Sequence, residues 1–147
     1  MFQKILVPTD GSRLSQKAVT KALALAKLCG GMLVVLHVYP RFAGSPYGSF
    51  GPSEELLAQA HVRQQQAQAE KLFAGIEEQA REAGVLIDTV LVESDDVQRE
   101  IIGIANKRRC DLICMASHGR RGIAGIVLGS ETQKVLVHST IPVLVLR

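Results

Sequence analysis

The sequence predicts an α/β fold, an open parallel five-stranded sheet with helices on both faces, of the Rossmann-like kind. Five short apolar runs alternate with longer segments of helical periodicity. Such alternation implies right-handed crossovers and strands that all run the same way. The chain has 147 residues, so we expect a single domain over residues 1–147.

The amino-terminal part predicts one strand, one turn and one helix. Lys4–Val7 is a short apolar strand, and Pro8–Ser12 is a turn in which Ser12 is the natural helix cap. The helix covers Arg13–Leu28 and ends before the Gly30-Gly31 pair. Its apolar side is a narrow stripe of Leu14, Ala18, Ala22, Leu25 and Ala26.

A second strand and a long helix flank an irregular segment. Met32–Val38 is almost continuously apolar, as expected of a strand buried on both faces, and the helix is predicted from Glu54 to Ala83. Residues 39–53 between them hold three prolines, three glycines and four of the six aromatic residues, so we expect a long loop. A lid, a partner-binding loop and a solvent loop with locally packed aromatics all remain open. The strongest apolar stripe of the helix is Leu72, Phe73, Ile76, Ala80 and Ala83.

The carboxyl-terminal part completes the alternation. A helix through Arg108, capped by Asp95 or Asp96, is predicted between the third and fourth strands. The remaining strands are predicted at Leu86–Val92, Asp111–Ala116 and Pro142–Leu146.

Composition excludes several classes of protein. The net charge of +3 is small and scattered, which argues against a nucleic-acid partner. No apolar run reaches the roughly 18–20 residues of a membrane span, and the first residues lack a signal-peptide pattern, so we expect a cytoplasmic protein without a membrane partner. Cys29, Cys110 and Cys114 have no metal-ligand spacing with the histidines and are interpreted as reduced packing residues.

The stretch 116–130 carries the clearest chemical signal. It follows a buried strand, contains four glycines and ends at Ser130–Gln133, a capping-box pattern that opens a helix over Thr132–His138. Free N–H groups and partial positive charge at such a helix start bind anionic oxygens when glycine lets the backbone come close. The stretch therefore predicts a phosphate site, although glycines and a serine there can also simply shape the turn.

The whole chain resembles the universal stress protein family. Its landmarks occur here in the family's order: Ile5–Ser12 on the first strand, His37-Val38 at the end of the second, and Pro142–Val145 in the last strand. Of the family's Gly-x2-Gly-x9-Gly-Ser/Thr loop, the chain has Gly119-x9-Gly129-Ser130. The resemblance implies the strand order 3-2-1-4-5. It also implies ATP as the ligand, with Mg or Mn held mainly by the phosphates and by water.

Site residues are carried over position by position from the ATP-binding branch of the family. Asp10 would face the ribose and phosphates, Val38 would lie near adenine, and Gly119, Gly129 and Ser130 with the next amides would hold the triphosphate. Each has a plainer structural alternative as a cap or a core residue. The full expected set is Pro8, Thr9, Asp10, Val38, Met115, Ala116, His118, Gly119, Arg120, Gly129, Ser130, Glu131 and Thr132.

Ala116 departs from the family pattern, which has glycine at this position. If the backbone here is extended, the extra methyl costs little, whereas a positive φ would put the site in doubt. The later glycines and the serine are present, so we expect ATP binding to be retained.

No catalytic residue is predicted. His118 stands beside Ser117 without an ordered acid–histidine–nucleophile set, and neither a Gly-x4-Gly-Lys-Ser/Thr motif nor a loop lysine is present. Slow or no turnover suits a sensor or switch, and the family resemblance implies that it serves the stress response. Alternatives are a nucleotide-free dimeric interaction module, a slow ATP-hydrolysing or nucleotide-processing enzyme, and a receiver-like module, for which the phosphoacceptor aspartate and late lysine are not convincingly placed.

The last strand predicts a homodimer. In the order 3-2-1-4-5 the fifth strand lies on an outer edge, and an apolar, uncharged edge strand invites pairing with a copy of itself. The expected interface consists of Val143, Leu144, Val145 and Leu146. The alternative is that an adjacent helix folds over this edge.

Overall fold

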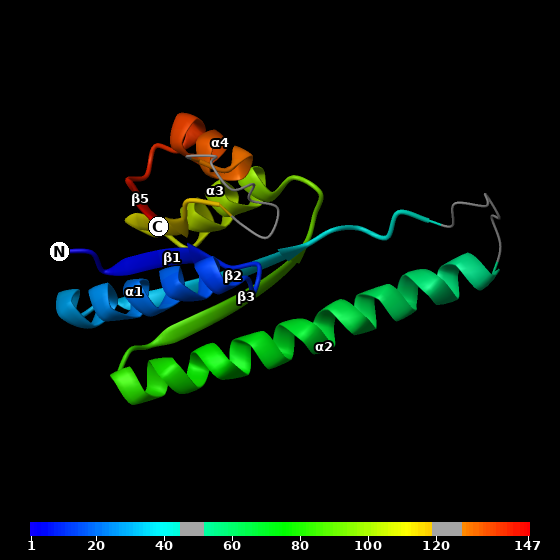
Figure 1. The fold of residues 1–147 in the computed structure, drawn as a ribbon, viewed down its shortest axis with the longest axis horizontal. Helices are drawn as coiled ribbons and strands as arrows, with labels where there is room; N and C mark the ends of the chain where they lie inside the picture. Colours follow the sequence, from blue (N-terminus) through cyan, green and yellow to red (C-terminus); the bar gives the residue numbers. More distant parts are fainter. Residues whose placement is uncertain (45–51, 119–127) are drawn as a thin grey trace.

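The computed structural model describes residues 1–44, 52–118 and 128–147. Five parallel strands form one sheet in the order β3-β2-β1-β4-β5, as expected from the sequence (Figure 1). The strands are β1 (Lys4–Pro8), β2 (Met32–Tyr39), β3 (Ile87–Glu93), β4 (Leu112–Ala116) and β5 (Val143–Leu146). The helices are α1 (Arg13–Cys29), α2 (Pro52–Ala83), α3 (Val97–Lys107) and α4 (Ser130–His138).

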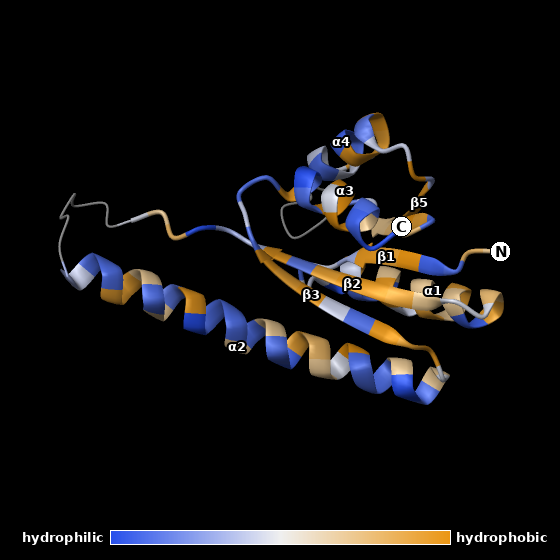
Figure 2. Cartoon of the chain, turned by 180° about the vertical axis from the view of Figure 1, so that it is seen from behind, coloured by the Kyte–Doolittle hydropathy of each residue, from blue (hydrophilic) through white to orange (hydrophobic). Residues whose placement is uncertain are grey.

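Helices α1 and α2 cover one face of the sheet, and α3 and α4 lie side by side over the other (Figure 1). Each face has its own apolar cluster, and the central strands contribute alternate residues to the two. Ile5 and Val7 of β1 point towards α1, whereas Leu6 points towards α3 and α4. Figure 2 shows the resulting concentration of hydrophobic residues along β1 and β2.

The helix ends follow local sequence signals. The hydroxyl of Ser12 accepts a hydrogen bond from the Ser15 amide and caps α1, as predicted. Asp96, not Asp95, caps α3, because its carboxylate accepts from the Arg99 amide.

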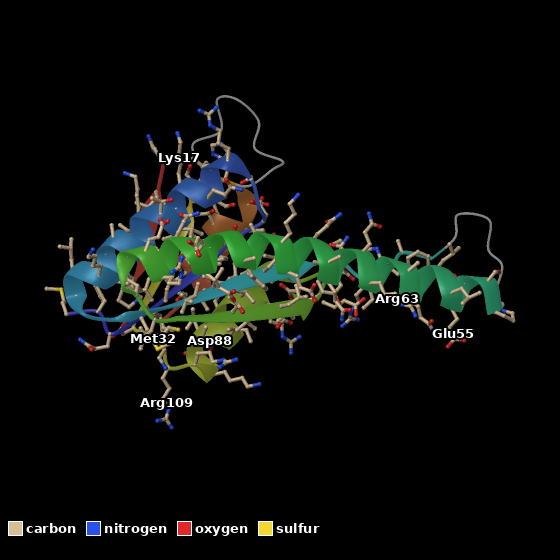
Figure 3. The ribbon with its side chains drawn as sticks, turned by 90° about the horizontal axis from the view of Figure 1, so that it is seen from below. Lys17, Met32, Glu55, Arg63, Asp88 and Arg109 are labelled. Carbon is tan, nitrogen blue, oxygen red and sulfur yellow. The ribbon has the colours of Figure 1, made fainter. Side chains whose placement is uncertain are left out.

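Helix α2 is much longer than the strands it accompanies. Its 32 residues span about 48 Å, and its buried residues, Ala69, Phe73, Ile76 and Ala80, all lie in the second half. In Figure 3, Glu55 and Arg63 lie on the part of α2 that extends past the sheet. Where it extends, the His61 ring donates from Nε2 to the Pro40 carbonyl at 2.9 Å. Segment 39–44, which follows β2, thus contacts the first half of α2 through this hydrogen bond.

The helix starts at Pro52, two residues earlier than predicted. Proline is favoured in the first turn of a helix, because an N–H group at that position would have no intrahelical acceptor and its loss costs nothing. Residues 45–51 of the predicted loop lie outside the described ranges. Among the described helices, none has the length and apolar character needed to cross a membrane.

Candidate functional site

The carboxyl ends of β1 and β4 meet in the middle of the sheet edge. The two strands are neighbours, pairing Ile5 with Leu112 and Leu6 with Ile113. The chain leaves β1 for α1 on one face and continues from β4 towards α4 on the other (Figure 1). In open α/β sheets, ligands bind in the crevice formed where the connections diverge in this way.

The turn after β1 forms one side of this edge. The Thr9 amide donates to the Leu36 carbonyl at 2.8 Å, and the Thr9 hydroxyl lies 3.0 Å from the Ser15 hydroxyl, so this buried side chain is committed to the turn. The Asp10 carboxylate accepts from the Ser12 amide at 2.9 Å. Gly11 has a φ of 75°, a left-handed conformation that favours glycine.

The residues after β4 are tied to the start of α4. The Gly129 amide donates to the Ser117 carbonyl at 2.7 Å, and the Thr132 hydroxyl donates to the Ala116 carbonyl at 3.0 Å. A Cβ added to Gly129 would lie 3.1 Å from the His118 Cα and 3.2 Å from its Cβ. Gly129 has φ −69° and ψ 154°, which any residue can adopt, so glycine is needed here for close approach rather than for backbone freedom.

Helix α4 begins without a side-chain cap. The cap position is Gly129, and Ser130 is the first helical residue, so the predicted capping box was wrong. The Gln133 side chain donates to the Leu128 carbonyl instead of reaching back to the cap amide. The first N–H groups of a helix have no intrahelical acceptor. Within the described ranges no side chain caps these groups, and an uncapped helix start of this kind is a candidate position for an anion.

The Glu131 side chain points towards α3. One carboxylate oxygen accepts from the Gln98 amide in the first turn of α3 at 3.0 Å, and the other lies 2.9 Å from the Lys134 ammonium. The hydrogen bond to Glu131 raises the pKa of Lys134, which therefore stays charged at neutral pH. Of the groups of Glu131, only its backbone amide remains a candidate donor of a hydrogen bond to a phosphate.

The backbone at Ala116, where the family pattern has glycine, is extended. It is the last residue of β4, pairs with Leu146 of β5 and has no positive φ. Its methyl group therefore causes no backbone strain. Any effect of alanine at this position is limited to the space that one methyl occupies.

The other predicted residues differ in their surroundings. Val38, near the end of β2, is partly buried against the cluster under α3, and the Met115 side chain belongs to the same core. Pro8 ends β1, and the His118 ring nitrogen Nδ1 lies 3.2 Å from the Ser117 hydroxyl. The remaining two predicted residues, Gly119 and Arg120, lie outside the described ranges.

Two residues at this edge were not among those predicted for the site. The His37 Nδ1 donates to the Thr9 carbonyl at 2.7 Å, and buried Ser117 links β5 to α4 through its amide and its carbonyl. Both are polar residues at the carboxyl end of an inner strand. That position is the signal that could have identified them.

Of the described residues that could serve metal or thiol chemistry, Cys110 precedes β4 and Cys114 lies inside it rather than at the carboxyl edge. Within the three described ranges, no three His, Cys, Asp or Glu side chains gather where they could hold a metal ion. Burial raises the pKa of both Cys110 and Cys114 to about 11, so these thiols are protonated at neutral pH and are poor nucleophiles.

The fold is that of an α/β protein with an open, parallel five-stranded sheet. The model of the universal stress protein family matches residues 1–147, and the chain belongs to this family. The universal stress protein YxiE of Bacillus subtilis is 32% identical over 150 residues, covering 100% of both chains.

Solved structures share the fold. The Methanocaldococcus jannaschii protein MJ0577, whose structure served to assign its biochemical function, is 27% identical with a TM-score of 0.83, and the match covers 99% of this chain and 96% of that one. A universal stress protein in complex with cAMP is 23% identical with a TM-score of 0.71, and the match covers 99% of this chain and 97% of the other.

Proposed function

We propose that this protein binds an adenine nucleotide, ATP in the first place, at the carboxyl edge of its sheet and acts as a nucleotide-dependent switch in the stress response. The phosphates would lie at the start of α4, against the amides of Ser130, Glu131 and Thr132. The ribose side would lie near Asp10, and adenine near Val38. A divalent ion, Mg or Mn, would be held mainly by the phosphates.

The observation that carries this proposal is the uncapped start of α4. The same chain caps α1 with Ser12 and α3 with Asp96, but it places a closely packed glycine before α4. A capping side chain would occupy the volume where a phosphate oxygen meets the amides. Gly129 has no side chain to occupy that volume.

Adenine as the base is supported by the family rather than by the geometry. The complex of a universal stress protein with cAMP contains an adenine nucleotide bound to the same fold. A switch suits the site better than fast turnover, because the described residues gather no cluster of metal ligands and the buried Cys114 thiol of β4 has a raised pKa. We place the protein in the cytoplasm, as its sequence led us to expect.

Calorimetric titration of the purified protein tests the proposal. We expect saturable one-to-one binding of ATP in the presence of Mg, and weaker binding of GTP at the same concentrations. Acid release from freshly purified protein should identify the nucleotide that it carries from the cell. If no adenine nucleotide binds in either the presence or the absence of Mg, the protein is instead a nucleotide-free interaction module.

Replacing Ala116 by glycine tests whether the family difference matters. We expect ATP affinity to stay the same or to rise by up to about threefold, because the change removes one methyl from extended backbone. Thermal stability should fall slightly, by about 1 kcal/mol or less, since glycine in a strand gains more freedom on unfolding. A several-fold loss of ATP affinity with thermal stability preserved would mean that the methyl contacts the ligand.

A further inference from the structure

Glu131 introduces a carboxylate into the first turn of the helix that would hold the phosphates. It is the second residue of α4, directly after Ser130, and its side chain is 37% exposed. A carboxylate and a bound phosphate at one helix start draw on the same partial positive charge and repel each other. The Glu131 carboxylate therefore opposes the binding of an anion at the start of α4, whereas the backbone amides there favour it.

The contacts of Glu131 show how this conflict is contained. Its carboxylate accepts from the Gln98 amide at 3.0 Å, so it takes part in capping α3, and it lies 2.9 Å from the Lys134 ammonium. The first contact ties the carboxylate to α3, and the second pairs it with a cation on α4 itself. They reduce the negative charge felt at the start of α4 without removing it, because Lys134 is half-exposed and its pairing is screened by water.

Repulsion from a fixed carboxylate grows with the charge of the ligand. A nucleoside monophosphate carries about two negative charges and a triphosphate about four at neutral pH, so the same carboxylate penalises the triphosphate more. A divalent cation bound to the triphosphate cancels most of the difference.

We propose that Glu131 sets how much phosphate charge the start of α4 accepts without a divalent cation, making it a residue that determines specificity among adenine nucleotides. This inference rests on the proposed function, since it concerns the same site. The wild-type site would hold AMP in the absence of metal, and it would hold ATP well only as the metal complex.

The test compares AMP and ATP binding, by calorimetry with EDTA and with Mg, in wild type and in Glu131→Gln. Glutamine keeps an oxygen that can accept from the Gln98 amide but carries no charge. In EDTA we expect Glu131→Gln to raise ATP affinity about three- to tenfold and AMP affinity less than about twofold. With Mg the gain for ATP should shrink to about twofold or less.

Glu100→Gln is the matched control, because it makes the same change in the first turn of α3. It should leave the ATP-to-AMP ratio unchanged. Glu131→Ala removes both the charge and the acceptor, and its ratio should also move towards ATP even if both affinities fall. An equal ratio in wild type and Glu131→Gln, with both nucleotides bound, overturns this inference alone. Failure of every nucleotide to bind wild type overturns the proposed function as well.

Discussion

Replacing Gly129 by valine is expected to abolish nucleotide binding, with at least a hundredfold loss of ATP affinity by calorimetry. The β-branched side chain would occupy the volume in front of the α4 amides. It would also press on the His118 backbone, which already lies 3.1 Å from where a Cβ would be. Overpacking of this kind typically costs about 1–3 kcal/mol of stability, so the melting temperature should fall by several degrees.

Alanine substitutions separate the loss of binding from the loss of fold. Gly129→Ala adds only the Cβ, so we expect a smaller drop in melting temperature and about a tenfold loss of ATP affinity. Gly103→Ala in α3 is the matched control, because nothing lies within 4 Å of its added Cβ. For this control we expect unchanged ATP affinity and a free energy of unfolding that rises by up to about 1 kcal/mol, because alanine favours helix more than glycine does. Wild-type affinity in Gly129→Ala and Gly129→Val would contradict the placement of the phosphates.

Leu144→Lys is expected to convert a dimer into a monomer. We propose that β5 pairs with its counterpart in a second copy, since it is the last strand of the sheet and only β4 pairs with it in the described part of the chain. Leu144 is 39% exposed on this edge, and Val137 of neighbouring α4 is 75% exposed. Burying these apolar side chains would favour association, whereas a lysine at position 144 would disfavour strand pairing.

Light scattering at micromolar concentration measures this effect directly. Leu144 is the better position to change, because Val143 packs partly into the core under α3 and α4, where a lysine would also disturb folding. Leu57→Lys on α2 is a control on a leucine that is 51% exposed and far from β5 in the sequence. A monomeric wild type, or a Leu144→Lys variant that remains dimeric and folded, would exclude this edge as the interface.

The sequence predicted the strands and helices well because their limits depend on local chemistry. Runs of Val, Ile and Leu fix the inner strands. Gly30 and Gly84 follow the first two helices in left-handed conformation, which other residues rarely adopt, so both ends were predictable to within a residue. The parallel strand order was not a matter of local chemistry, and it came from the family resemblance.

The site was less predictable because its decisive contacts join distant segments. A Ser-x-x-Gln pattern is compatible with serine as the cap or as the first helical residue, and only the packing of Gly129 against His118 decides between them. In the same way, the Glu131 carboxylate finds the Gln98 amide only because α3 and α4 lie side by side. Sequence spacing predicts neither the packing of Gly129 against His118 nor the hydrogen bond between Glu131 and Gln98.

The length of α2 has a consequence for how the protein opens. Its second half is packed on the sheet through Phe73 and Ile76, so its backbone hydrogen bonds break only when the core itself unfolds. Among the described residues, its first half has no buried side chain and contacts segment 39–44 through His61, so we expect it to fray while the sheet stays intact. We therefore expect one continuous helix to belong to two cooperative units, with the boundary near Ala69, the first buried residue of α2.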